Sequence, residues 1–266
     1  MKSPIVLLTD FGHTDPYVGQ MKGVLATHAP DVPVIDLCHG VRPQAVAQAA
    51  MFLSASFTYF PEGSVFVCVV DPGVGTDRDI LCLHAAGRYV LAPDNGLISP
   101  LLSEYPSSVC YRVDISEFDD ASQTFHGRDI FCPLAARIAL GADADILGTV
   151  ISHAHVAMPR CAVPVANGEY VDCSVLHIDT FGNVVLNLNV VPWRERLAAW
   201  EDLYLKQTPP IRVMRANSFG TLPPNTLGCI EGSQGFLELV LNGASAAQML
   251  KVSMDDIITL QGYPIG

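Results

Sequence analysis

Short apolar runs alternate with helix-like segments through the first half of the chain. Strands are expected at residues 4–8, 32–37, 64–70, 81–85 and 89–91. Helices are expected at residues 16–26, 44–57, 97–102 and 130–140. The run at residues 64–70 is apolar or β-branched almost throughout, as in a strand buried on both faces. The alternation predicts an α/β N-terminal domain with a mostly parallel sheet flanked by helices.

The pattern changes after residue 152. An irregular stretch with Pro159 and Pro164 follows, and helical periodicity becomes scarce beyond it. Short strands are expected at residues 168–178, 183–188, 211–215, 226–231, 236–241 and 257–260, with one short helix at 244–251. This pattern predicts an all-β, barrel-like C-terminal domain. The expected organisation is an α/β catalytic domain at residues 1–155, a linker at 156–167 and a substrate-binding β-barrel at 168–266.

Composition and charge limit the classes of partner and the cellular location that are expected. Half of the 266 residues are hydrophobic and 16% are charged, which is enough for a large core. The formal charge of −12 argues against a nucleic-acid partner and is compatible with a cationic small ligand. No apolar run reaches transmembrane length, so no membrane association is expected. The eight cysteines form no CxxC pair, which predicts buried free thiols and a reducing, cytoplasmic location.

The end of the run at residues 64–70 is the first place to look for chemistry. Asp71-Pro72-Gly73-Val74-Gly75 follows it, and Pro72 ends the strand. The two glycines are expected to let the backbone turn where a Cβ would obstruct. Ligands of open α/β sheets bind beyond the carboxyl ends of the strands. Asp71, with Arg78 seven residues later, is therefore a candidate pair.

Two further polar side chains follow elements of the first domain. Asp10 comes after the first strand, and His126 precedes the helix at 130–140. These two residues and Arg78 each have an ordinary alternative. Asp10 could be a helix cap, Arg78 a solvated loop charge and His126 a structural histidine. Asp71, Arg78 and His126 together form a set that can polarise a water molecule, the carboxylate accepting its proton.

The second domain offers a binding candidate. Asp179 and Asn183 can hold a ligand while Phe181 stacks on an aromatic ring, although the stretch also fits an Asx turn. Ser233 lies between two glycines, which is equally ordinary for a hairpin. His153 and His155 have no third ligand near them, so no metal site is predicted.

Several motifs taken together point to one family. LLTDFG, VVDPGVGTDRD, APDNG, FHGRDIF and IDTFGNVVLN, in this order, resemble the S-adenosyl-L-methionine (SAM) hydroxide adenosyltransferase family. That family is homologous to the fluorinating and chlorinating enzymes that use SAM. The resemblance spans about residues 5–250. It implies an α/β domain, a C-terminal β-barrel and a homotrimer whose active sites lie between the first domain of one subunit and the second domain of its neighbour.

The resemblance also assigns roles to residues. The family's catalytic Asp, Arg and His fall on Asp71, Arg78 and His126. The carboxylate that holds the ribose hydroxyls falls on Asp10. The other positions implied to bind substrate are Phe125, Asp179, Phe181, Asn183 and Ser233. Gly232-Ser233 departs from the family's usual Asn-Ser pair, which leaves the contacts to the methionine part open.

The same residues favour water over halide. The halogenating relatives have Tyr in place of the Asp and of the His, and the inserted loop of the fluorinase is absent here. A carboxylate at Asp71 repels a halide anion but can orient water. The expected function is hydrolysis of SAM to adenosine and L-methionine by in-line attack on ribose C5′, with SAM as substrate and no cofactor. The alternatives are a halide-using adenosyl transferase and a non-catalytic sensor of SAM or adenosine.

Overall fold

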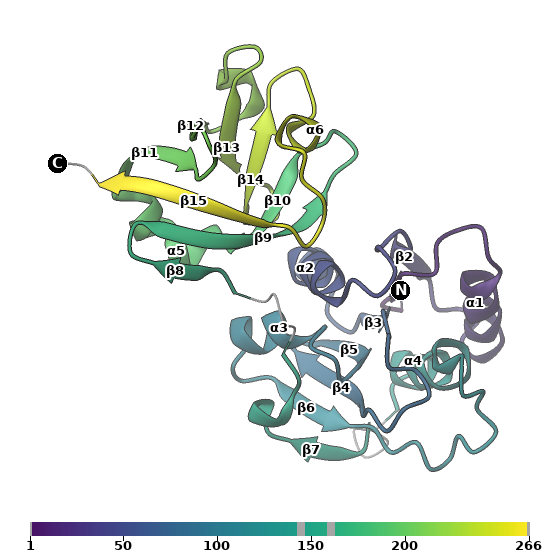
Figure 1. Ribbon diagram of the computed structural model, residues 1–266. Coiled ribbons are helices and arrows are strands. Elements are labelled where there is room, and N and C mark those ends of the chain that lie inside the picture. The colour runs from purple at the N-terminus through teal and green to yellow at the C-terminus, as the bar shows by residue number, and fades with distance from the viewer. Residues whose placement is uncertain (1, 143–146, 159–162, 265–266) are drawn as a thin grey trace. The chain divides into compact units, whose positions relative to one another are not determined.

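The chain folds into two compact units, Met1–Arg160 and Cys161–Gly266. The computed structural model describes residues 2–142, 147–158 and 163–264, and Figure 1 shows the elements of each unit. Of the linker expected at residues 156–167, residues 159–162 lie outside the described part of the chain. No helix within the described residues is long and apolar enough to cross a membrane.

The first unit is built on a seven-stranded sheet in the order β2-β1-β3-β5-β4-β6-β7. The strands are β1 (Ile5–Thr9), β2 (Val34–Cys38), β3 (Val65–Val69), β4 (Ile80–Ala85), β5 (Arg88–Pro93), β6 (Val109–Arg112) and β7 (Thr149–Ile151). Strands β2, β1, β3 and β5 run parallel, and β4, β6 and β7 extend the sheet with antiparallel pairs. The expected pair around Gly87 is confirmed as the β4–β5 hairpin.

Helices cover both faces of this sheet. They are α1 (Tyr17–His28), α2 (Val46–Phe57), α3 (Ser99–Glu104) and α4 (Cys132–Ala139), with a π-helix η1 (Gly127–Phe131) before α4 and a 3-10 turn η3 (His153–His155). Met21 of α1 belongs to the same buried cluster as Val67 of β3 and Phe131, beside α4. On the other face, Phe57 of α2 packs on Phe66 of β3 with ring centroids 5.4 Å apart. Figure 1 shows α1 and α4 together and α2 and α3 together.

The central strands are apolar because both of their faces are covered. All five residues of β1 and all five of β3 are buried. Successive side chains of a strand point to opposite faces, so a strand between two helical layers needs apolar residues at every position. The continuous run at residues 64–70 therefore marks the centre of the sheet, and the expected α/β fold is confirmed.

The second unit is a closed β-barrel of seven strands. They are β9 (Tyr170–Ile178), β10 (Val184–Asn189), β11 (Trp200–Leu205), β12 (Ile211–Arg215), β13 (Leu227–Glu231), β14 (Phe236–Leu241) and β15 (Ile257–Pro264). The order β10-β14-β13-β12-β11-β15-β9 is closed by pairing of β9 with β10. The edge strand β8 (Val165–Asn167), within the segment expected as a linker, pairs with β9. Helices α5 (Val190–Ala198) and α6 (Ala246–Leu250) and the turn η4 (Phe219–Thr221) complete the unit.

The sequence did not predict helix α5 or strand β11 of the barrel unit. Helix α5 contains Pro192, but proline is tolerated in the first turn, and Asn189 caps this helix by accepting a hydrogen bond from Val191 N at 3.0 Å. Strand β11 has buried apolar residues, but the polar pair Glu201-Asp202 interrupts the apolar pattern by which a strand is recognised in a sequence. The cap at Asn189 therefore accounts for the start of α5, and burial of its apolar residues accounts for β11.

The expected free thiols are confirmed for the cysteines that the structure describes. Cys38 is half-buried, and those at positions 68, 82, 110, 132, 173 and 229 are buried; Cys161 lies outside the described residues. Burial raises the pKa of Cys229 to about 11, so this thiol stays protonated at neutral pH.

Close packing inside the barrel gives a stability prediction. A Cβ on Gly262 of β15 would overlap the ring of buried Trp200, whereas a Cβ on Gly220 would meet nothing within 4 Å. We expect Gly262→Ala to lower the free energy of unfolding by about 2 kcal/mol or more, because the indole must move. Gly220→Ala, the matched control, should stay within about 0.5 kcal/mol of wild type. Urea denaturation measures both, and equal stability of the two variants would contradict the packing.

Candidate active site

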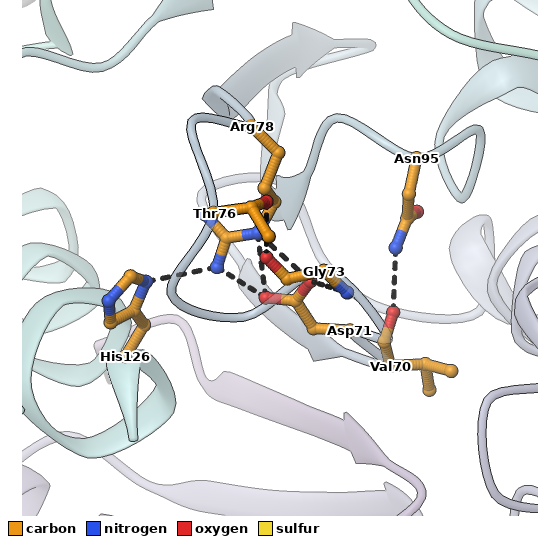
Figure 2. A network of polar contacts seen from close by, with 7 residues as sticks. All are labelled: Val70, Asp71, Gly73, Thr76, Arg78, Asn95 and His126. Atoms are coloured by element: carbon orange, nitrogen blue, oxygen red, sulfur yellow. Dashed lines mark hydrogen bonds and ion pairs between the residues drawn. The ribbon is translucent and has the colours of Figure 1, made fainter. Parts of the chain in front are cut away.

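A buried ion pair forms directly beyond strand β3. Arg78 Nε donates to both carboxylate oxygens of Asp71, at 2.9 and 2.8 Å, and Nη2 also donates to Oδ2. The side chains of Arg78 and Asp71 are 9% and 4% exposed. Arg78 is thus not a solvated loop charge. Figure 2 shows the two-pronged contact across the loop. Such a fork fixes the orientation of both groups.

The loop at residues 71–78 is shaped by local hydrogen bonds and one glycine. Gly73 N donates to Asp71 Oδ1 at 3.2 Å, and Thr76 Oγ1 donates to the Gly73 carbonyl at 2.7 Å. Gly75 has φ +77°, and a Cβ there would lie 2.6 Å from the Gln123 carbonyl oxygen. The expected need for glycine is therefore met at Gly75. At Gly73 a Cβ would make only ordinary contacts.

His126 joins the pair from a distant segment. Its Nδ1 lies 3.0 Å from Arg78 Nη2. A guanidinium only donates, so Nδ1 must be the acceptor, and the neutral ring carries its proton on Nε2. Burial and the charge of Arg78 lower the pKa of His126, while Asp71 and Asp129 oppose that change. Both the contact and the electrostatics therefore favour neutral imidazole.

A small cavity of about 50 Å³ lies against this set. It is lined by Asp10, Phe11, Val69, Asp71, Val74, Thr124, Phe125, His126 and Gly127. This volume is enough for one ordered water, which needs two to four polar partners. Asp71, which offers an acceptor, and His126, which offers a donor, are both among the residues that line the cavity.

Asp10 and Phe125, the two residues of the first unit predicted to bind substrate, both line this cavity. Asp10 Oδ2 accepts a hydrogen bond from Gln44 N at 2.8 Å. Helix α1 has no side-chain cap, so the alternative of Asp10 as a helix cap is wrong. The Phe125 ring packs edge-on against Phe11 and Tyr17, at 5.7 and 5.3 Å between centroids. A carboxylate thus stands beside an aromatic cluster.

Asn95 supports the end of strand β3 and was not among the predicted site residues. Its Nδ2 donates to the Val70 carbonyl at 2.8 Å, and its Oδ1 accepts from Leu97 N at 3.2 Å. Figure 2 shows Asn95 reaching Val70 immediately before Asp71. The APDNG motif that contains Asn95 was the available signal, but a turn motif alone does not reveal which strand it holds.

In the barrel unit, Asp179 forms the Asx turn that was the alternative to ligand binding. Oδ1 accepts from Phe181 N at 2.9 Å and Asn183 N at 2.8 Å, and Oδ2 accepts from Asn183 Nδ2 at 2.8 Å. The turn leaves Phe181 79% exposed. The aspartate therefore builds a rigid support for an aromatic ring.

The predicted barrel residues share one pocket of about 410 Å³. Its lining is His177, Asp179, Phe181, Asn183, Val185, Asn217, Ser218, Phe219, Ile230, Glu231, Gly232, Ser233, Gln234 and Glu238. Phe219 and Glu238 were missed because neither stands in a recognisable motif. A Cβ at position 232 would overlap the Glu238 carboxylate, so Glu238 would have to take another conformation if the family's usual Asn stood there. Burial and the nearby charge of Asp179 raise the pKa of Glu238.

Within the described residues, no three or more His, Cys, Asp or Glu side chains are grouped so as to hold a metal ion. His153, one of the two histidines considered as a metal ligand, has its Nε2 2.9 Å from the Ser108 carbonyl oxygen and donates to it.

Comparison with known proteins places this site in a family. Models of the SAM hydroxide adenosyltransferase N-terminal and C-terminal domains match residues 5–148 and 173–259. The chain belongs to the SAM hydroxide adenosyltransferase family. The resemblance drawn from the motifs is thereby confirmed.

Relatives cover nearly the whole chain. A Thermus thermophilus protein named (R)-S-adenosyl-L-methionine hydrolase is 34% identical, over 93% of this chain and 95% of its own length. A solved structure of an uncharacterised conserved protein from Thermotoga maritima superposes with a TM-score of 0.85 at 31% identity, covering 97% of this chain and 99% of that one. A fluorinase from Nocardia brasiliensis is 28% identical, over 70% of this chain and 71% of its own length.

The neutral state of His126 gives a pH prediction. Its pKa is lowered in the folded protein, so the imidazole is neutral at pH 7 and gains a proton only below its ordinary range near 6.5. Protonation removes the acceptor for Arg78, and we expect kcat to fall as the pH drops through that lowered pKa. The free energy of unfolding should also fall as the pH drops, because His126 in the unfolded chain takes up its proton at a higher pH than in the folded protein.

His126→Asn tests this, since an amide oxygen near the position of Nδ1 accepts from Arg78 and does not titrate. The fall of kcat at low pH that wild type shows and this variant does not is the part due to protonation of His126. Identical pH profiles of kcat and of unfolding free energy for the two proteins would contradict the assignment.

Proposed function

We propose that the protein hydrolyses SAM to adenosine and L-methionine. The observation that carries this proposal is the buried Asp71–Arg78–His126 set beside a cavity of water size, in a chain of this family. The supporting relatives include the (R)-S-adenosyl-L-methionine hydrolase of Thermus thermophilus.

The chemistry needs a nucleophile more than an acid. The water oxygen bonds to ribose C5′ as the C5′–S bond breaks, and the electron pair of the C5′–S bond goes to sulfur. The sulfonium leaves as the neutral thioether of methionine, and one proton of the water is released. No general acid is required at the leaving group, so one compact set of polar groups is sufficient. The reaction as written needs no cofactor.

Each member of the set has a role in this proposal. Asp71 orients the water and takes its proton, and Arg78 stabilises the developing hydroxide. His126, neutral with its proton on Nε2, supplies a supporting hydrogen bond. Asp10 holds the ribose hydroxyls beside Phe125. Because attack must be in line with the departing sulfur, this positioning contributes as much as the proton transfer.

The barrel pocket is proposed to hold the rest of the substrate. Phe181 offers an exposed ring for stacking on the adenine, and Asn183 and Asp179 fix the turn that carries it. Ser233 lines the same pocket and is assigned to polar contacts with the substrate. The negative charge of the chain favours a cationic substrate over neutral adenosine, though salt screens this effect.

We further propose that the enzyme works as a cytoplasmic homotrimer, with active sites formed between subunits. The support is the family membership for the trimer and the buried free thiols for a reducing compartment. Sedimentation analysis of the purified protein tests the trimer directly.

One incubation separates the candidate reactions. SAM is incubated with the protein in H₂¹⁸O, with and without chloride, and the products are separated and weighed by mass spectrometry. Hydrolysis gives methionine and adenosine carrying ¹⁸O at the 5′-hydroxyl. Formation of 5′-chloro-5′-deoxyadenosine would instead show a halide-using transferase, and tight binding without turnover would show a sensor.

Asp71→Ala is expected to remove turnover while leaving substrate binding largely intact. The loss of the water-orienting carboxylate should lower kcat by a factor on the order of 10² to 10⁴. Adenosine affinity, measured by calorimetry, should change by less than about threefold, since the proposed ribose contact is Asp10. Asp77→Ala, in the same loop with an exposed side chain, is the matched control and should behave as wild type. Normal turnover by Asp71→Ala would rule out the water-activation role.

A further inference from the structure

The turn that carries Asp10 is held from one side by the segment that follows strand β2. Gly12 N donates to the His39 carbonyl at 2.7 Å, and Gln44 N donates to Asp10 Oδ2 at 2.8 Å. Gln44 has φ +66°, a left-handed conformation that non-glycine residues seldom adopt. The local backbone therefore accepts an unfavourable conformation at the residue that presents an N–H to the carboxylate of Asp10.

A third contact is buried beneath this turn. Nδ1 of His39 lies 2.8 Å from Oγ1 of Thr9, the last residue of β1, and Phe11 N donates to the same Oγ1 at 3.3 Å. Thr9 is 0% exposed and the His39 side chain is 0% exposed. With Phe11 N–H occupying one lone pair of the threonine oxygen, the hydroxyl proton is free to point at Nδ1.

The far side of the His39 ring faces a charge. Nε2 lies 3.1 Å from Asp36 Oδ1, within ion-pair distance but not aligned as a hydrogen bond. Lys22 Nζ donates to the other oxygen, Oδ2, at 2.6 Å. Partial burial opposes ionisation of Asp36, but Lys22 and His39 more than offset this and lower its pKa. A carboxylate there favours the imidazole proton on Nε2, which leaves Nδ1 as the acceptor for Thr9.

We propose that His39 and Thr9 form a buried positioning pair that sets the turn at residues 9–12, and through it the carboxylate of Asp10, for substrate binding. The inference rests on the proposed function, because Asp10 is the proposed ribose ligand. The donor order runs from Phe11 N–H to Thr9 Oγ1, from the Thr9 hydroxyl to His39 Nδ1, with His39 Nε2–H facing Asp36.

Burial separates this role from a catalytic one. Asp36, His39 and Thr9 have the side-chain types of a nucleophile triad, but neither Thr9 nor His39 is among the residues that line the 50 Å³ cavity. Both side chains are closed to solvent, so no substrate atom reaches the hydroxyl. Their effect must pass through the backbone of residues 10–12. Such an effect changes binding of the ribose in the ground state and the transition state alike, and so raises KM more than it lowers kcat.

Two matched pairs of variants test the proposal. Thr9→Val removes the hydroxyl at nearly constant shape, and Thr9→Ser keeps it. His39→Leu removes both ring nitrogens, whereas His39→Asn keeps a polar atom near the position of Nδ1. His84→Leu changes a half-buried histidine that stacks on Tyr89 in strand β5, and serves as the control. For each protein, kcat, KM for SAM, the dissociation constant of adenosine and amide hydrogen exchange at Phe11 and Gly12 are measured.

We expect His39→Leu to weaken adenosine binding and raise KM by about tenfold, the effect of losing one buried hydrogen bond. Thr9→Val should do so by at least as much, because it also removes the acceptor of Phe11 N. The value of kcat should stay within about twofold, and exchange at Phe11 and Gly12 should accelerate. Thr9→Ser and His39→Asn should recover most of the affinity. The double variant Thr9→Val/His39→Leu should be no worse than Thr9→Val alone, because Thr9→Val already removes the contact between the two side chains.

The outcomes are separable. Unchanged adenosine affinity and unchanged amide exchange in folded Thr9→Val would overturn the positioning role. Equal impairment of His39→Leu and His39→Asn would do the same, since it would show a packing effect of the ring alone. If the wild-type protein neither hydrolyses SAM nor binds adenosine, the proposed function fails. Amide exchange at Phe11 and Gly12 still decides in that case whether the pair holds the turn.

Discussion

The ion pair between Asp71 and Arg78 is the interaction on which the rest of the site depends. Removing two charges from water costs free energy that a single contact rarely offsets, so such a pair persists only with good geometry and further hydrogen bonds. Here the guanidinium donates to both carboxylate oxygens and also to Nδ1 of His126. One side chain thus connects the loop after β3 to the start of the π-helix η1, two segments far apart in the sequence. Irregular helical turns of this kind are frequent at functional sites.

The same arginine also fixes what the site can hold. It forces His126 to accept at Nδ1 and therefore to donate from Nε2, while Asp71 is an acceptor. A water molecule both donates and accepts hydrogen bonds, so it can satisfy a carboxylate and an N–H donor together. A halide ion only accepts, and it has nothing to offer the carboxylate. The expected preference for water over halide therefore rests on the pairing of the polar groups as well as on their charge.

Sequence reasoning succeeded where the signal is local. The buried run at residues 64–70, its end at Asp71 and the need for glycine at position 75 all depend on neighbouring residues, and the structure has each of them. It failed where the partner is distant. The local sequence suggests that Asp10 is a helix cap, yet its carboxylate accepts from Gln44 N. The neighbouring Thr9 contacts His39, which is also distant in the sequence. The barrel-like second unit was predicted and is confirmed, but the pair of strands that closes it, β9 and β10, could not be read from a pattern of single strands.

Asp179 shows that the structural and functional interpretations of a motif are not alternatives. Its carboxylate is occupied by N–H groups of Phe181 and Asn183, so it has little capacity left for a direct ligand contact. The turn holds a largely exposed phenylalanine among the residues that line a pocket, and exposure to water is unfavourable for an apolar group. A ring fixed in this way loses little conformational entropy when a flat ligand covers it. In the proposed function, the turn therefore presents the ring on which the adenine stacks, and the role of Asp179 is to hold that turn.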